Sequence, residues 1–327
     1  MRVQLQCLHL ILCTGALLFE SGGVSAQTYP TRPLRMVVGY TPGGFTDTMA
    51  RAVGDKLSAA LGQQVLIDNK PGANSIIGAD FVAKSAPDGH TLAMVIAAHS
   101  VNATLYAGKL PFDTQRDFAP VSLVAVAPLI LVASNSFAPR SVAELIAYAR
   151  ANPGKVNFGS SGIGAAAHLG MEYFMIVTGT KMVHAPYKGT APALTDLMGG
   201  QIQIMFDTPS SMMPHVRGAK IRALAMASEK RASVAPEIPT LIEGGVPNYV
   251  YGTWAMLLAP ANTPRDIVYR LSTEVAKIMR SAEIRERFAT LGVDAVGNTP
   301  EEASEFLRSE IAKSGKIVRD AGVKVDN

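Results

Sequence analysis

The sequence predicts an α/β fold of two lobes that are joined by crossing strands, with a cleft between the lobes. Short β-rich runs alternate with amphipathic helical stretches, which favours parallel sheets covered by helices on both faces. Residues 121–134 and 254–259 form two apolar runs, placed where the chain can cross from one lobe to the other and back. The length of 327 residues also exceeds what one hydrophobic core normally supports.

Hydrophobic periodicity and turn residues predict the elements of the N-terminal unit. Four apolar residues from Met49 to Leu61 recur at every fourth position, as on one face of a helix, and Gly62 ends that helix. The strand before it ends in a turn at residues 41–44. We expect strands at 34–40, 64–69 and 91–97, and helices at 46–61 and 76–86.

The second unit repeats this alternation. Ser141 and Glu144 have the spacing of a capping box, which satisfies backbone N–H groups at a helix start. Thr263-Pro264 and Thr299-Pro300 each place a cap before a proline at the first helical position. We expect strands at 156–159, 182–187, 202–206 and 221–227, and helices at 141–151, 165–177, 190–198 and 210–217, followed by longer C-terminal helices.

The two apolar runs divide the chain into lobes. Residues 121–134 are too many for one ordinary strand, and Trp254 to Ala259 offers a strand for the return. Two crossings make the first lobe discontinuous. We therefore predict that residues 27–125 and 254–327 form lobe 1 and that residues 126–253 form lobe 2. Lobes joined in this way close by rotation at a few strand residues.

The N-terminus has the pattern of a cleaved signal peptide at residues 1–26. Arg2 precedes an apolar stretch from Leu8 to Phe19, and Val24-Ser25-Ala26 supplies the small residues that signal peptidase reads. The stretch is shorter than the roughly 20 residues of a membrane-spanning helix. We therefore predict export to the periplasm. Both cysteines lie in this leader, so we expect no disulfide and no cysteine metal site after cleavage.

The charge pattern favours small anions over nucleic acid. The net charge is +4, and the basic residues are spread along the chain without an arginine-rich stripe. A modest positive field attracts anionic small molecules. Nucleic acid is therefore not an expected partner.

Two glycine-rich turns, each between a strand and a helix, are the first candidates for a binding site. Residues 40–47 read Tyr-Thr-Pro-Gly-Gly-Phe-Thr-Asp, and residues 158–164 read Phe-Gly-Ser-Ser-Gly-Ile-Gly. Glycine lets the backbone approach a ligand, and a helix start offers unpaired N–H groups to a carboxylate. A tight turn with Thr46 or Asp47 as helix cap explains the first motif equally well. Two such loops, one from each lobe, can hold a carboxylate across the cleft.

Enzymatic interpretations lack their residues. Gly162, Gly164 and Ala167 satisfy G-x-G-x-x-G/A, but the next strand ends at Tyr187 without the acidic residue that a dinucleotide ribose needs. Ser160 is not part of a nucleophile elbow. The histidines at positions 90, 99, 168, 184 and 215 show no metal-ligand spacing. We expect no cofactor, no metal and no catalysis.

Several further motifs occur in a fixed order along the chain after the leader. They are Tyr29-Pro30-x-Arg32-Pro33, Gly43-Gly44-x-x-Asp47, Asn69-x-Pro71-Gly72-Ala73, Pro87-Asp88-Gly89, Asp117-Phe118-Ala119-Pro120-Val121, Gly159-Ser160-Ser161-Gly162, Pro186-Tyr187-Lys188-Gly189 and Phe206-Asp207. In these motifs the chain resembles the Bug-type, TctC-like substrate-binding proteins of tripartite tricarboxylate transporters. The resemblance covers nearly the whole chain after the leader.

The resemblance implies a type II periplasmic-binding-protein fold and a membrane permease as partner. It also implies that the two glycine loops hold one ligand carboxylate, partly through water, while more variable positions read the other end. The ligand-binding residues expected on this basis are Tyr40, Pro42, Gly43, Gly44, Phe45, Asp47, His99, Asn102, Gly159, Ser160, Ser161, Gly164, Ala165, His168, Tyr187, Asp207 and Thr253.

One departure from the family pattern concerns the ligand. Members usually carry Thr or Ser after the second glycine loop, where this chain has Ala165-Ala166-Ala167. The missing hydroxyls, together with Phe45 in the first loop, point to a less polar second end of the ligand, such as an aromatic carboxylate or a short monocarboxylate. Alternatively, Phe45 packs into its own lobe and water replaces the hydroxyls.

The sequence therefore predicts a monomeric periplasmic protein that captures a small carboxylate and hands it to a permease. The ligand class includes dicarboxylates, aromatic carboxylates and amino acids. Two alternatives stay open at this point, an exported enzyme that acts on small organic acids and a ligand sensor for a membrane kinase. The enzyme would need a nucleophile–base pair or a metal site, whereas the sensor would use the same residues as the transport protein.

Overall fold

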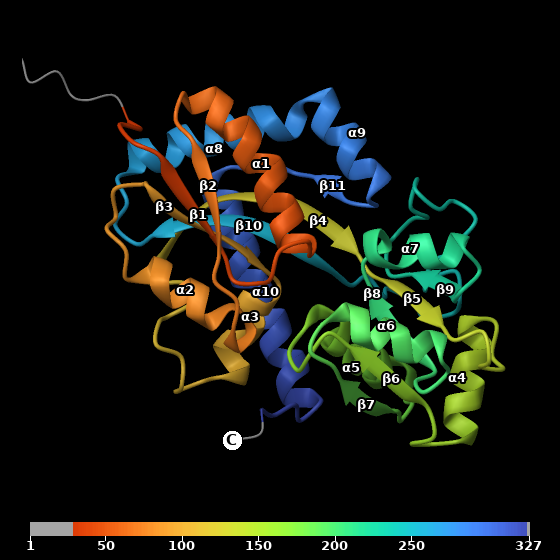
Figure 1. The fold of residues 1–327 in the computed structure, drawn as a ribbon. Coiled ribbons are helices and arrows are strands. Elements are labelled where there is room, and N and C mark those ends of the chain that lie inside the picture. Colours follow the sequence, from red (N-terminus) through yellow and green to blue (C-terminus); the bar gives the residue numbers. More distant parts are fainter. Residues whose placement is uncertain (1–28, 326–327) are drawn as a thin grey trace, which may run out of the picture.

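The computed structural model describes residues 29–325, so the predicted signal peptide at 1–26 lies outside the described residues (Figure 1). Two sheets organise the chain, one in each lobe, and the predicted two-lobed α/β fold is confirmed. The first sheet contains, in spatial order, β11 (Asp294–Ala295), β4 (Phe118–Pro128), β10 (Gly252–Pro260), β3 (Thr91–Ile96), β1 (Leu34–Val38) and β2 (Val65–Asn69). The second contains β7 (Val183–Pro186), β6 (Asn157–Ser160), β8 (Ile204–Asp207), β5 (Ile130–Ala133) and β9 (Arg222–Met226).

Both sheets are mixed, whereas the alternating pattern predicted parallel sheets. β1 pairs in parallel with β2 and β3, and β6 pairs in parallel with β7 and β8. The antiparallel pairs involve β4, β5 and β10, the strands at which the chain passes between the sheets. The passage from β4 to β5 takes place at Leu129. β4 leads the chain out of lobe 1, and β10 brings it back. Because β10 lies beside β4, the two strands run in opposite directions.

Helices cover both faces of the first sheet. On one face lie α1 (Phe45–Leu61), α8 (Arg265–Arg280) and α9 (Ala282–Thr290). Together they bury Met36 and Val38 of the sheet, and the apolar side of α1 belongs to the same core. On the other face, α2 (Ile76–Ala83) and α10 (Pro300–Asp320) pack against Val37 and Trp254. Alternate residues of β1 therefore enter different cores, as the two-residue repeat of a strand requires.

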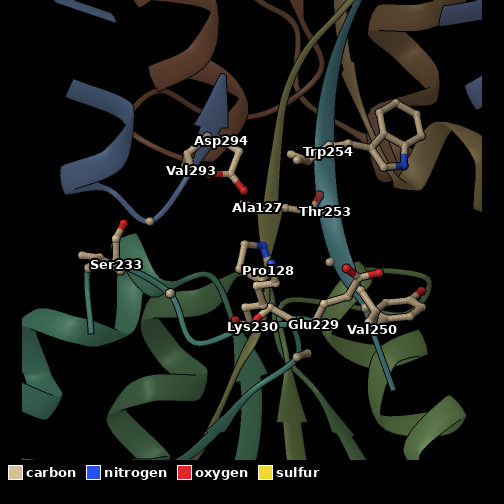
Figure 2. Close-up of a pocket in the computed structure, with 18 of the residues that line it drawn as sticks. Ala127, Pro128, Glu229, Lys230, Ser233, Val250, Thr253, Trp254, Val293 and Asp294 are labelled. Atoms are coloured by element: carbon tan, nitrogen blue, oxygen red, sulfur yellow. Dashed lines mark hydrogen bonds between the residues drawn. The ribbon is translucent and has the colours of Figure 1, made fainter. Parts of the chain in front are cut away.

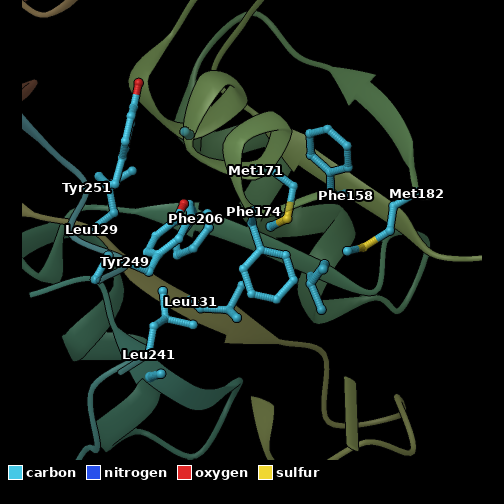
Figure 3. Packing of buried hydrophobic residues seen from close by; sticks show 14 of the residues in the cluster. Leu129, Leu131, Phe158, Met171, Phe174, Met182, Phe206, Leu241, Tyr249 and Tyr251 are labelled. Atoms are coloured by element: carbon cyan, nitrogen blue, oxygen red, sulfur yellow. The ribbon is translucent and has the colours of Figure 1, made fainter. Parts of the chain in front are cut away.

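The second lobe has a core rich in aromatic residues (Figure 3). Phe158, Phe174, Phe206 and Tyr249 lie together between the sheet and the helices α4 (Val142–Ala151) and α5 (Ala166–Thr178). The Tyr249 hydroxyl donates to the Gly170 carbonyl at 2.5 Å, which satisfies the one polar atom of that ring. On the opposite face lie α6 (Thr190–Met198) and α7 (Pro209–Arg217).

Helix α3 (Ala98–Leu105) was not predicted from the sequence. It has only eight residues, which is too few for periodicity to distinguish it from a loop. Val101 and Leu105 of α3, with Ile317 and Val318 of α10, belong to the aromatic core of the second lobe. Lobe 1 therefore extends two helices into lobe 2, and α3 is stabilised by this tertiary contact.

The predicted helix starts were right to different degrees. At α10, Thr299 and Glu302 form a complete capping box. At α4, Ser141 accepts the Glu144 N–H, but the Glu144 carboxylate accepts the N–H of Arg140, one residue earlier than expected. α8 begins one residue later than predicted, at Arg265, because the Thr263 hydroxyl donates to the Pro260 carbonyl and does not cap the helix. Within residues 29–325, every helix is too short or too polar to span a bilayer.

Candidate functional site

The described helices differ in how their first N–H groups are satisfied. α4, α9 and α10 each begin with a serine or threonine side chain that accepts an N–H of the first turn. α1, α5 and α6 begin after Gly44, Ala165 and Gly189 and have no side-chain cap, and α2, α3, α7 and α8 also lack one. α1, α5 and α6 all follow parallel strands. Their first turns therefore offer N–H groups and partial positive charge to an anion.

Asp47 supports the first glycine loop from within. Its side chain is buried and accepts the Gly43 N–H at 2.9 Å, the Arg51 guanidinium at 2.9 and 3.0 Å and the Asn69 amide at 3.0 Å. Burial alone would raise the pKa of Asp47, but the bonds from Arg51, Gly43 and Asn69 together lower it. Asp47 is therefore ionised, with its charge compensated inside the lobe. Asp47 holds the turn through these bonds. Its carboxylate does not cap α1 and is not exposed to solvent.

The two glycines of the first loop are open to approach. Pro42, Gly43 and Gly44 are exposed, and a Cβ added to Gly43 would have no neighbour within 4 Å. Gly43 has φ of +87°, a conformation that glycine adopts readily. Tyr40 and Phe45, at either side of the turn, pack against the core that α1 shares with α8. The interpretation in which Phe45 packs into its own lobe is therefore the one that the structure favours.

The second glycine loop is held by packing. A Cβ on Gly159 would lie 2.3 Å from Cδ1 of Ile202, so the end of this core side chain would have to move to admit any other residue. Ser160 is fully buried; its hydroxyl donates to the Gly162 carbonyl and lies 2.7 Å from Nε2 of His184. Ser161 is half-buried and makes no hydrogen bond within the described residues. Of the two serines, Ser161 is thus the one whose hydroxyl is available.

Two stacked histidines lie behind the second loop. The rings of His168 and His184 are 3.8 Å apart and nearly parallel. His168 accepts the Gly164 N–H on Nδ1 at 3.1 Å, and its Nε2 lies 3.3 Å from the Glu172 carboxylate. Burial, and to a lesser extent His168, lowers the pKa of His184 to about 3, so His184 is uncharged at neutral pH. His168 thus orients the loop through Gly164 and does not present a free nitrogen to a ligand.

Other predicted site residues have partners within their own lobes. His99 is buried against Phe112 and Phe118, with Nε2 3.0 Å from the Thr114 carbonyl. Burial lowers the pKa of His99 to about 4. His99, which was expected to bind the ligand, therefore packs in the core. The Tyr187 hydroxyl donates to Asp196 of α6 at 2.6 Å.

Asp207 is a buried carboxyl at the end of β8. It accepts the Thr190 hydroxyl and the Thr208 N–H, both at 2.7 Å. Burial raises the pKa of Asp207 in spite of these bonds. Asn102 is also buried, and its side chain pairs with Asn74, a residue absent from the predicted set. Ala165 is half-buried and begins α5.

A cavity of about 670 Å³ lies beside the crossing strands, between the lobes (Figure 2). Its walls come from the ends of β4 and β10, from residues 227–234 of lobe 2, and from α9, β11 and α10 of lobe 1. Thr253 is the predicted site residue that lines it. Neither glycine loop contributes to its walls, so the cavity is distinct from the two loops and shares only Thr253 with the predicted ligand-binding residues. Among residues 29–325, no cluster of three His, Cys, Asp or Glu side chains is arranged to hold a metal.

The sequence model of the TctC family, described as the tripartite tricarboxylate transporter family receptor, matches residues 49–323. The chain belongs to the TctC family. Two curated relatives match over almost the whole chain. BugT of Bordetella pertussis is 37% identical over 307 residues, covering 92% of this chain and 93% of BugT. A protein encoded between tcbD and tcbE of Pseudomonas sp. strain P51 is 35% identical over 312 residues, covering 94% of this chain and 93% of that protein.

Solved structures of TctC-type proteins have the same fold. A Rhodopseudomonas palustris protein, Rpa4515, determined with adipate, superposes with a TM-score of 0.84 at 35% identity over 90% of this chain and 99% of its own. MatC of the same species, with bound malate, gives 0.80 at 31% identity over 89% of this chain and 100% of its own. The periplasmic binding protein BugD gives 0.81 at 32% identity over 90% of this chain and 99% of its own. This TctC-family chain is therefore a solute-binding protein and not an enzyme.

Proposed function

We propose that this TctC-family protein captures a small carboxylate in the periplasm and delivers it to a tripartite-type membrane transporter. The observation that supports this most strongly is the pair of helix starts, α1 and α5, that lack side-chain caps and follow glycine loops in different lobes. A carboxylate between them would accept N–H groups from both lobes, so its binding favours the closed arrangement. The related proteins solved with adipate and with malate support a carboxylate ligand.

The site that we propose combines backbone and a few side chains. Gly43 and Gly44 admit the carboxylate, and the first turns of α1 and α5 with the Ser161 hydroxyl donate to it. Asp47 and His168 hold the two loops in place. The donors are neutral, so the helix dipoles and the modest net charge of +4 supply the attraction for the anion.

We propose a dicarboxylate over an aromatic or short monocarboxylate. The case for a less polar second end depended on Phe45 and on the alanine run from residue 165 to residue 167. Phe45 packs against its own lobe, which leaves only the alanine run in favour of that end. The related proteins that were solved with adipate and with malate, both of them dicarboxylates, support this choice.

A thermal-shift screen of carboxylates tests the function directly. A true ligand at about 100 times its Kd stabilises the folded protein by about 2.7 kcal/mol, which raises the Tm by several degrees. We expect adipate or malate to give this shift. Hexanoate, which has the same six carbons as adipate but one carboxylate, is the matched control and should give a smaller shift. A panel in which no carboxylate raises the Tm would contradict the proposal.

A further inference from the structure

The segment between β2 and α2 has an unusual backbone. Ala73, Asn74 and Ser75 are three consecutive residues, none of them glycine, with φ of 46°, 53° and 71°. This left-handed region is costly for residues with a Cβ, and asparagine tolerates it better than most. Three in succession persist only where the surrounding structure holds them.

Packing and hydrogen bonds hold this segment. A Cβ on Gly39 would lie 2.0 Å from Oγ of Ser75, so Ser75 sits directly against the backbone that follows β1. The Asn74 amide donates to Oδ1 of Asn102 at 2.8 Å, and the Asn102 amide donates back to the Asn74 carbonyl at 3.0 Å. The Tyr40 hydroxyl, just before the first glycine loop, lies 3.5 Å from Oδ1 of Asn74.

The same side chain contacts the other lobe. A Cβ on Gly164, in the second glycine loop, would lie 3.2 Å from Nδ2 of Asn74 and 2.7 Å from Cδ2 of Leu105. Gly164 therefore lies directly against lobe 1, and its φ of +81° also requires glycine. Asn74 thus lies between Tyr40 of the first loop and Gly164 of the second.

We propose that Asn74 is a positioning residue that fastens the second glycine loop to lobe 1 when the lobes are closed. The inference rests on the proposed function, because a closed arrangement around a ligand is what makes this contact useful. When the lobes rotate apart, Gly164 must leave Asn74 and Leu105. The contact therefore stabilises the closed form, and its loss speeds ligand release.

The variant Asn74→Gly separates this role from a structural one. Glycine adopts the left-handed conformation without strain, which offsets the loss of the hydrogen bond to Asn102, so the variant should fold with a ligand-free Tm near that of the wild type. Asn262→Gly is the matched control, because Asn262 is exposed, has φ of 64° and lies between β10 and α8. With adipate as probe, we expect Asn74→Gly to raise the dissociation rate about tenfold with little change in the association rate, and Asn262→Gly to change neither.

A second measurement does not need a ligand. Hydrogen exchange over residues 159–169 should be faster in ligand-free Asn74→Gly than in the wild type or in Asn262→Gly, since the loop loses its contact with Asn74 and keeps those with Leu105 and Val101. Asn74→Asp should behave as Asn74→Gly does, because a carboxylate beside Oδ1 of Asn102 loses the hydrogen bond that holds the side chain at position 74 against Gly164. Unchanged exchange over this segment would overturn the proposal for Asn74. Failure of the wild type to bind adipate would instead count against the proposed dicarboxylate function, and exchange alone would then decide the role of Asn74.

Discussion

The two glycine loops look alike in the sequence, yet glycine serves a different purpose in each. In the first loop, a side chain on Gly43 or Gly44 would meet almost no protein atom. In the second loop, a side chain on Gly159 would collide with Ile202, and one on Gly164 would collide with Leu105. The first loop is therefore open to a ligand, whereas the second is glycine-rich because lobe 2 and lobe 1 pack closely around it.

The loops are also supported differently. An ionised carboxylate, Asp47, holds the first loop by a charge-assisted bond to the Gly43 N–H. The second loop is held by two histidine side chains, with His184 against Ser160 and His168 against Gly164. Substituting Asp47 should therefore lower stability in a way that depends on pH, substituting an open glycine of the first loop should affect binding, and substituting Gly159 should lower stability through packing alone. Three loop substitutions test this contrast, in order of decreasing expected effect, with Asp207→Asn as the control for the first.

Asp47→Asn should cost the most stability, about 1.5–3 kcal/mol, because it removes hydrogen bonds between charged groups. The folded state lowers the pKa of Asp47, so its stabilisation is present above the unfolded value of about 4 and is lost as pH falls through the folded pKa. Unfolding free energies of the variant and the wild type should therefore differ at pH 7 and converge below about pH 4.

Asp207→Asn is the control with the opposite sign. Burial raises the pKa of Asp207, so the ionised form costs stability at neutral pH, and this cost disappears as pH falls through the folded pKa. The asparagine oxygen can still accept the Thr208 N–H, and its amide nitrogen can donate to the Thr190 hydroxyl oxygen, so the variant should be more stable than the wild type at pH 7 and lose this advantage in acid. If the unfolding free energies of the two variants depended on pH in the same way, the two carboxylates would not differ in their effect on stability.

Gly159→Val should lower the free energy of unfolding by about 1–3 kcal/mol, because it overpacks the core around Ile202. The loss should be the same with and without carboxylate, as measured by calorimetry. Gly199→Val is a suitable comparison, since its nearest protein neighbour outside the chain's adjacent residues is a carbonyl at 3.5 Å. A Gly159→Val protein with wild-type stability would show that packing does not explain this glycine.

Gly44→Ala should leave stability within about 0.5 kcal/mol of the wild type, because Gly44 has φ of −79° and open space at its Cβ position. The added methyl group would stand where the carboxylate approaches, so we expect adipate affinity to fall by about tenfold, or about 1.4 kcal/mol. Titration calorimetry measures this directly. Unchanged affinity would mean that the first loop is not where the ligand binds.

Local patterns in the sequence were sufficient for much of the fold. The strands at β1 and β2, the helix start at Thr299 and the family motifs were all predicted from neighbouring residues, because propensity, capping and turn chemistry act over a few positions. Helix α3 was missed because eight residues carry too little periodic signal. The antiparallel pairing of β4 with β10 was also missed, since it depends on where the chain returns to lobe 1.

Within the candidate site, the sequence indicated which residue types were present but not which way they faced. His99 was expected near the ligand and lies in the core, because Phe112 and Phe118 surround its ring. Asn74 was not predicted as a site residue, because the residue types in Ala73-Asn74-Ser75 do not indicate a left-handed backbone. Its contact with Gly164 joins positions far apart in the chain.

The sequence by itself determined the class of this protein, since ordered motifs and alternating elements identify a TctC-type fold from local information. Only the tertiary structure showed what role each glycine of the two loops has. Gly43 and Gly159 both follow a strand and precede a helix, but what surrounds a missing side chain depends on residues brought from elsewhere in the chain. Packing density in the core leaves no room at Gly159, while the surface at Gly43 leaves room for a ligand.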